Sequence, residues 1–215
     1  MNAFFSVGDL GLGTGPGFMA FGDLTGTTGV DGDDFSRDPT VMCHEYTHAI
    51  AAFGGLAFSG AALDNPPRAV NEAIADYFAA SFFKDPRIGF ALAQLCSPAL
   101  FTALGLAPDG LRNLSDPLTM LDNLDDLLDG NNIPEEHAAG HIFGCALWRI
   151  RTAVKQHKSD ISILFSLFDW PQSMAEVGIG TVDGTNALDA YATYYAACIQ
   201  AIVDDTFFFF GPRRR

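Results

Sequence analysis

Apolar residues recur at helical spacing along most of the chain, and this pattern predicts a mainly helical protein. The first such stretch follows Asp38, a good N-cap, and Pro39, which suits the first position of a helix. Its apolar side consists of Val41, Met42, Tyr46, Ala49 and Ile50. Gly54-Gly55 then stops the run, so the sequence predicts a helix over residues 38–54.

Further helical stretches follow along the chain. The pattern predicts a helix that opens after Asn65-Pro66-Pro67 and runs until Lys84-Asp85-Pro86. Further helices are predicted from about 134 to 158, after Asp160 to Phe168, and from about 186 to 205. A loop that includes Gly178 separates the last two. Helices therefore account for most of the chain after its first fifty residues.

The first 37 residues follow a different pattern, because frequent glycines there favour turns and loops. Phe18–Phe21 is the best short strand in this region. The fold class is therefore α+β and mainly helical, with a small N-terminal β region. With 215 residues, 48% of them hydrophobic, the chain can bury a sizeable core, and one domain divided into two lobes is the natural count.

One long stretch without charge, Ile88–Pro108, is nominally long enough to cross a bilayer. Gly89, Ser97-Pro98 and Gly105 interrupt it, however, and such residues break a helix. The interruptions favour two short buried helices over a membrane span.

The charge balance excludes one class of partner. The formal net charge is −14, and Arg213–Arg215 is the single basic cluster, whereas nucleic-acid binding needs a basic face. No signal peptide is visible, since the first residues lack a positive start and a continuous apolar run before Asp9. Acidic groups in residues 31–34 and 122–129 are candidates for calcium, but they match no complete calcium loop, and solvated acidic loops are favoured.

The four cysteines, Cys43, Cys96, Cys145 and Cys198, lie far apart and fit no metal or redox spacing. Their even number permits disulfides. Cys43 and Cys145 lie inside predicted helices, however, and cysteine is commonly buried, so free thiols are favoured.

A metal-binding pattern lies in the middle of the first predicted helix, where residues 44–48 read H-E-x-x-H. On a helix, His44 and His48 project from one face, so one zinc ion can take both rings. Glu45, next to the first ligand, can then reach a water on the metal. The motif predicts a zinc centre.

Catalytic zinc takes three protein ligands and keeps one open position, so a third ligand is needed. Glu72, in the second predicted helix, can supply it. Asp76, one turn later on the same face, can accept the free ring N–H of a zinc-binding histidine. Two ionisable residues in an otherwise apolar helix need such partners.

H-E-x-x-H followed by N-E-x-x-x-D at residues 71–76 resembles the gluzincin metallopeptidases of the thermolysin and fungalysin type. Similar segments occur in the family's order from residue 2 to about 151: Asn2–Phe5, Phe21–Asp23, Leu111–Pro117, His137–Gly140 and Ala146–Arg151. The resemblance implies a zincin-like fold in a single metallopeptidase domain, residues 1–215. Residues 1–54 would form the β region and active-site helix, and residues 55–215 the helical lobe.

The resemblance also assigns roles at the metal. Zinc would be held by His44, His48 and Glu72, with Asn71 and Asp76 as outer partners. Glu45 would take a proton from the zinc-bound water and deliver it to the leaving amine. His137 would stabilise the oxyanion together with zinc. His141, on the same face of its helix, is the runner-up to His137 or a surface residue.

Five residues are assigned to substrate binding by the same resemblance. Asn2 and Ala3 would belong to an edge strand that pairs with an extended peptide, although a frayed terminus is the alternative. Val41 and Leu111 would line the pocket for the residue after the scissile bond. Arg112 would hold a substrate carbonyl, form a structural ion pair with an acidic neighbour, or do both.

The function implied is that of a secreted zinc endopeptidase that cleaves peptides or proteins before apolar residues. An upstream propeptide or a larger assembly is a further expected partner. Phe58 stands where the family often has an oxyanion tyrosine, which would leave oxyanion stabilisation to His137. This departure, and the aromatic and basic tail Phe207–Arg215, motivate an alternative: a catalytically weak or inactive zinc-binding module in a larger assembly. In the tail, phenylalanines packed into the core are favoured over a docking segment.

Overall fold

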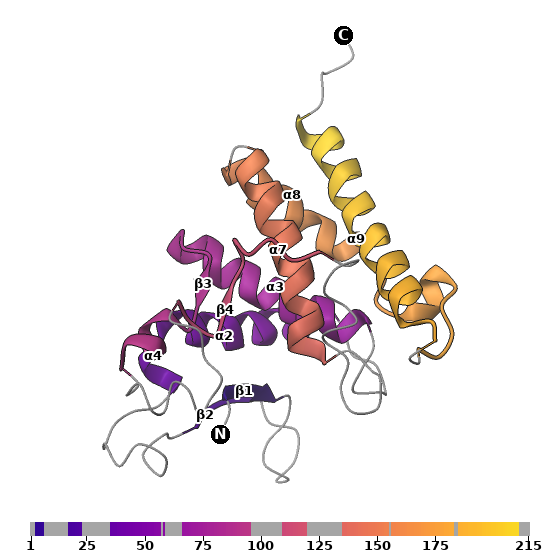
Figure 1. Ribbon diagram of the computed structural model, residues 1–215. Coiled ribbons are helices and arrows are strands. Elements are labelled where there is room, and N and C mark those ends of the chain that lie inside the picture. Colours follow the sequence, from indigo (N-terminus) through magenta and orange to yellow (C-terminus); the bar gives the residue numbers. More distant parts are fainter. Residues whose placement is uncertain are drawn as a thin grey trace. The chain divides into compact units, whose positions relative to one another are not determined.

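The computed structural model of the protein describes residues 3–6, 17–22, 35–56, 58, 66–95, 109–119, 135–154, 156–182 and 185–210 (Figure 1). Its α-helices are α2 (Pro39–Phe53), α3 (Pro66–Phe83), α4 (Phe90–Leu95), α7 (Glu136–Ala153), α8 (Gln156–Ser166) and α9 (Ala187–Phe210). The short 3-10 helices are η1 (Phe35–Arg37), η3 (Leu167–Asp169) and η4 (Met174–Val177). The strands are β1 (Ala3–Ser6), β2 (Phe18–Phe21), β3 (Arg87–Ile88) and β4 (Arg112–Asn113).

Helices predominate among the described residues, and the strands form two antiparallel sheets of two strands each, β1–β2 and β3–β4. The predicted α+β, mainly helical class is therefore confirmed. The chain divides into two compact units, residues 1–55 with 74–115 and residues 56–73 with 116–215. Their boundary falls inside α3, so both units share this one continuous helix.

The first unit fixes α2 through a buried cap. As predicted, Asp38 is the N-cap: its Oδ1 accepts hydrogen bonds from the backbone N–H groups of Thr40 and Val41 at 2.8 and 3.3 Å. Its Oδ2 accepts from the N–H of Leu92 at 3.0 Å, and the Thr40 hydroxyl accepts from the N–H of Gly89 at 2.8 Å. The cap therefore also attaches the segment around α4 to the start of α2.

The β3–β4 pair places Arg112. Arg87 pairs with Asn113 and Ile88 with Arg112, and the N–H of Leu111 donates to the Ile88 carbonyl at 2.7 Å. The chain can approach so closely because residue 110 is glycine. Its φ is +125°, and a Cβ there would lie 2.4 Å from the Ile88 oxygen.

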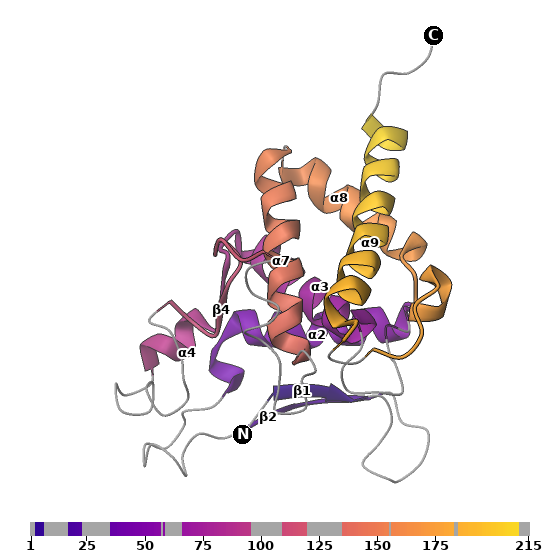
Figure 2. The same ribbon diagram turned by 45° about the vertical axis from the view of Figure 1, so that its right-hand side comes forward.

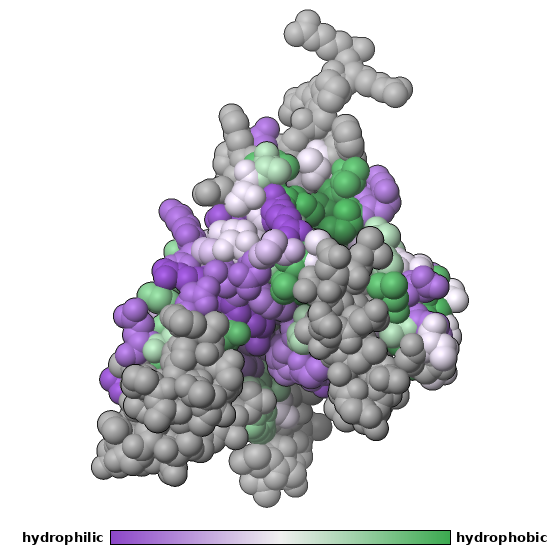
Figure 3. All heavy atoms as spheres, in the orientation of Figure 1, coloured by the Kyte–Doolittle hydropathy of each residue, from purple (hydrophilic) through white to green (hydrophobic). Residues whose placement is uncertain are grey.

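Aromatic packing forms the core of the second unit, where α8 contacts both α7 and α9 (Figure 2). Phe143 stacks on Tyr195 at a centroid distance of 4.5 Å and meets Trp170 edge-on at 5.7 Å. The Tyr195 hydroxyl donates to the Ala139 carbonyl at 2.8 Å, which holds α9 against the first turns of α7. Apolar side chains are also exposed around α8 and α9, including Leu164 and Phe168 (Figure 3).

Two predicted helix boundaries are wrong. The third helix ends at Ala153 rather than Lys158, because Val154 is extended (φ −99°, ψ 154°). The next helix, α8, begins at residue 156 and runs through the polar segment 158–160, which the pattern left outside the short helix. That segment is fixed as a helix because Ser159 is buried and Oδ1 of Asp160 forms an ion pair with Nε of Arg151 at 3.0 Å.

The last helix extends to Phe210, beyond the predicted end at Asp205. The packing predicted for the phenylalanines of the tail concerns side chains outside those that the structure describes. The candidate calcium loops, residues 31–34 and 122–129, also lie outside the described residues.

No helix in the described part of the chain is long and apolar enough to cross a membrane. Within the uncharged stretch the structure shows one short helix, α4, as predicted, but among its described side chains Leu92 alone is buried. Residues 96–108 lie outside the described ranges.

The described cysteines are free thiols: Cys145 and Cys198 are fully buried and Cys43 is partly exposed. Burial raises the pKa of the Cys43 and Cys198 thiols, which lowers their thiolate fraction. With iodoacetamide at pH 8, we expect Cys145 and Cys198 to be alkylated only after unfolding in guanidinium. Peptide mapping by mass spectrometry checks this. Rapid labelling of either residue in the native protein would contradict its burial.

Candidate metal centre

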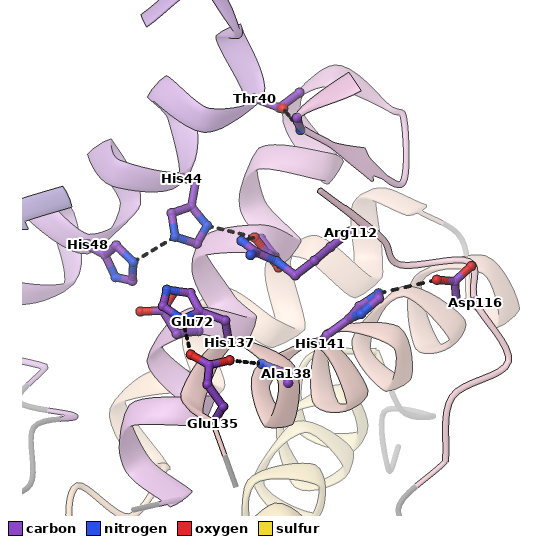
Figure 4. Close-up of polar contacts among 12 residues, drawn as sticks. Thr40, His44, His48, Glu72, Arg112, Asp116, Glu135, His137, Ala138 and His141 are labelled. Atoms are coloured by element: carbon purple, nitrogen blue, oxygen red, sulfur yellow. Dashed lines mark hydrogen bonds and ion pairs between the residues drawn. The ribbon is translucent and has the colours of Figure 1, made fainter. Parts of the chain in front are cut away.

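The helix α2 brings two imidazoles together. His44 and His48 lie one turn apart, and their Nε2 atoms face each other at 3.0 Å (Figure 4). Two nitrogens bound to one tetrahedral zinc ion, at bond lengths of about 2.0–2.1 Å, lie roughly 3.3 Å apart. The two Nε2 atoms are therefore already close to the separation that a shared metal ion requires.

A buried carboxylate sets the orientation of the first histidine. Asp76, 1% exposed, accepts from His44 Nδ1 at 2.8 Å through its Oδ1. When Nδ1 carries the proton of this bond, Nε2 presents its lone pair, which is the state that binds a metal. The predicted contact between Asp76 and a histidine of the motif is present.

Arg112 completes this network. Its guanidinium donates to both oxygens of Asp76, from Nε at 2.5 Å and from Nη2 at 2.8 Å. Burial alone would raise the pKa of Asp76, but Arg112 and the His44 ring together hold it well below its usual range. Asp76 is therefore a carboxylate, able to accept the His44 proton. The structural ion pair predicted for Arg112 is present, and a contact of Arg112 with substrate stays a prediction.

Glu72, the third member of the group, lies on α3 together with Asp76. It lies one turn before Asp76, so the two carboxylates share a face of the helix. Because Asp76 contacts His44, this face is directed at the histidines. One ligand atom from each of His44, His48 and Glu72 lies within 4.8 Å of the others, and the group can hold a metal ion.

The donor set fits zinc. Two imidazole nitrogens and one carboxylate oxygen form a ligand set that catalytic zinc uses with one position left open. The ring contact that orients a zinc-binding histidine, here His44 with Asp76, is also in place. Asn71, the other predicted outer partner, precedes Glu72 on α3 and is partly exposed. Glu45 follows His44 on α2 and is 4% exposed, and a carboxylate is buried to this extent only with polar partners.

His137 lies beside the predicted third ligand. Its Nε2 is 3.4 Å from Oε2 of Glu72, whereas His141, one turn later on α7, lies 3.7 Å from a carboxylate oxygen of Asp116. The structure thus separates the two histidines that the sequence left as alternatives. Which of them acts in a reaction stays a prediction.

Sequence reasoning missed the role of Glu135. Glu135 is the N-cap of α7: its Oε2 accepts from the N–H of Ala138 at 2.9 Å, and its Oε1 accepts from Nδ1 of His137 at 2.5 Å. Burial would raise the pKa of Glu135, but the His137 ring and the N–H groups of the first turn lower it to about 2. The sequence feature that could have indicated this contact is a glutamate two residues before a histidine at the start of a predicted helix.

The predicted pocket residues belong to one apolar cluster of the first unit. Ala3, Val41 and Leu92 are buried in it, and Leu111 packs against it. Val41 is only 4% exposed, so its side chain is enclosed by the cluster rather than presented as an open wall. Asn2 lies outside the described residues. Substrate contacts of these residues stay predictions.

Phe58 is a core residue of the second unit. It is 2% exposed and packs against Trp170 at a centroid distance of 6.2 Å. A side chain so enclosed by its own unit fills core space. The structure therefore gives a packing reason for a phenylalanine here, and its predicted correspondence to an oxyanion tyrosine stays a prediction.

No protein-family model, curated protein or solved structure matches the chain. The resemblance to the thermolysin and fungalysin type therefore stays a prediction from short motifs. What the centre does has to follow from its own donor atoms and their surroundings.

Proposed function

We propose that the protein is a zinc-dependent endopeptidase of the gluzincin type, with a zincin-like arrangement of α2 and α3. One observation carries this proposal: the Nε2 atoms of His44 and His48 converge at 3.0 Å beside Glu72 while Asp76 holds the other nitrogen of His44. A histidine pair that merely filled space would need no carboxylate to orient one ring.

His44, His48 and Glu72 would hold the zinc ion. When bound, zinc supplies Lewis acidity, which brings the pKa of a water ligand toward neutrality and polarises a substrate carbonyl. Three protein ligands leave a position for water or substrate, whereas structural zinc sites close all four. Among the described residues the group has three members, His44, His48 and Glu72, and this number supports a catalytic centre.

Glu45 is the general base of the proposed reaction. Its carboxylate accepts a proton from the water as the oxygen attacks the peptide carbonyl carbon. The same proton is then delivered to the amide nitrogen as the C–N bond breaks, so the products are a carboxylate and a free amine. A buried carboxylate adjacent to His44 has no structural zinc role, which supports this assignment.

The proposed substrate is a peptide or an unfolded protein. By the resemblance, the residue after the scissile bond is apolar. The edge of the β1–β2 pair offers backbone groups for an extended chain, which is strand addition. The resemblance to the gluzincin peptidases also implies that the protein is secreted.

Casein hydrolysis tests the proposal. We expect the purified protein to digest casein, to lose this activity in 1,10-phenanthroline and to recover it when zinc is restored, because the metal provides the Lewis acid. Mass spectrometry of the products should show apolar residues at the new N-termini. Charged residues dominating after the cut would contradict the specificity, and digestion unaffected by the chelator would contradict the zinc mechanism.

A zinc-binding module without turnover is the second candidate. It is favoured by the ion pair of Arg112 with Asp76, because this arginine was the predicted substrate-binding cation. Stoichiometric zinc together with no cleavage of any unfolded substrate would support the module instead of the peptidase.

A further inference from the structure

A chain of contacts in the second unit ends on the predicted third zinc ligand. The N–H of Ala138 donates to Oε2 of Glu135 at 2.9 Å, and Nδ1 of His137 lies 2.5 Å from the other oxygen of Glu135. On the far side of the ring, Nε2 of His137 lies 3.4 Å from Oε2 of Glu72 (Figure 4). His137 thus stands between two carboxylates, one of which is anchored to the start of its own helix.

Close packing of α7 on the first part of α3 holds this arrangement. A Cβ at Gly140 would lie 2.7 Å from the Ala69 carbonyl oxygen and 2.9 Å from Cβ of Glu72, so glycine is needed for the contact. Arg68 also pairs with both carboxylate oxygens of Glu136, at 2.7 and 2.5 Å. The position of His137 beside Glu72 is therefore set by backbone packing and a second ion pair.

We propose that His137 is a positioning residue for zinc binding: it holds one oxygen of Glu72 so that the other faces the metal. The inference rests on the proposed zinc centre. One ring nitrogen of His137 contacts Glu135 at 2.5 Å, and the other faces Oε2 of Glu72 at 3.4 Å, so the ring bridges the two carboxylates. His137 then does for Glu72 what Asp76 does for His44: it fixes a ligand from outside. Outer contacts of this kind typically change metal affinity by about 10–100-fold.

Zinc affinity, measured without substrate by competition with a chromophoric chelator, tests the inference. We expect His137→Ala to bind zinc about 10–100-fold more weakly. His137→Gln, whose amide can still donate to Glu72, should retain most of the affinity, whereas the shorter amide of His137→Asn should not. His141→Ala is the matched control, because His141 is on the next turn of α7 and pairs with Asp116. Its affinity should equal that of the wild type.

The outcomes separate this inference from the proposed function. If His137→Ala binds zinc like the wild type and only its kcat falls, His137 acts on the substrate and the inference is overturned. If the affinity falls as expected but the wild-type protein cleaves no substrate, the inference stands and the peptidase proposal fails. A wild type that binds no zinc overturns both. Should the alanine variant not fold, the contrast between glutamine and asparagine decides.

Discussion

Glu45→Gln is expected to keep its zinc and to lose turnover of casein by a factor of about 10²–10⁴, the usual contribution of a general base. Glutamine has nearly the shape of glutamate and fits the same buried position, but it cannot accept a proton from the attacking water. The three proposed zinc ligands, His44, His48 and Glu72, are unchanged. Measuring kcat together with zinc content separates the chemistry from metal binding.

The matched control is Glu176→Gln, the same chemical change at an exposed glutamate in η4 of the second unit. Its turnover should equal that of the wild type. If Glu45→Gln lost zinc in proportion to activity, Glu45 would support the centre structurally instead of moving a proton. Full activity in Glu45→Gln would remove it from the mechanism.

The parts of the centre that the sequence predicted correctly depend on local geometry. Asp38, Pro39 and Gly54 bound α2 because caps act on the nearest turn. Within that helix, four-residue spacing alone directs His44 and His48 to one side. The same spacing places Glu72 and Asp76 on one face of α3. The contact of Asp76 with His44 therefore also directs Glu72 toward α2.

The parts that the sequence could not predict depend on packing between segments far apart in the chain. No feature of the neighbouring sequence indicates that Arg112 donates to Asp76, 36 residues earlier in the chain. The same holds for the burial of Val41 against residues of β1 and α4. Gly140 reads as an ordinary helical glycine until the Ala69 carbonyl is found against it. The motifs therefore identify the residues of the candidate centre, whereas the contacts around those residues require the fold.

Asp76→Asn is expected to have the largest effect on stability among these variants, because the buried carboxylate of Asp76 contacts both Arg112 and His44. An asparagine can offer His44 one oxygen, but its NH₂ group then faces the guanidinium of Arg112 and cannot accept from it. Removing one partner of a buried pair typically costs about 3–5 kcal/mol, and Asp76 is the buried acceptor of two hydrogen bonds from Arg112. His44 also loses a charged acceptor, so zinc affinity should fall by about 10–100-fold.

Asp85→Asn is the matched control, because Asp85 also accepts two hydrogen bonds from one arginine, Arg87, at 2.8 and 2.6 Å. About a third of each of these two side chains is exposed, whereas Asp76 is 1% exposed. The control therefore compares the same ion pair in water and in the interior, where the desolvated charge is far more costly to leave alone. We expect its denaturation midpoint and zinc affinity to stay close to those of the wild type. If both variants unfolded at the wild-type denaturant concentration, the Arg112–Asp76–His44 network would contribute nothing to the fold, and the orientation of His44 would need another cause.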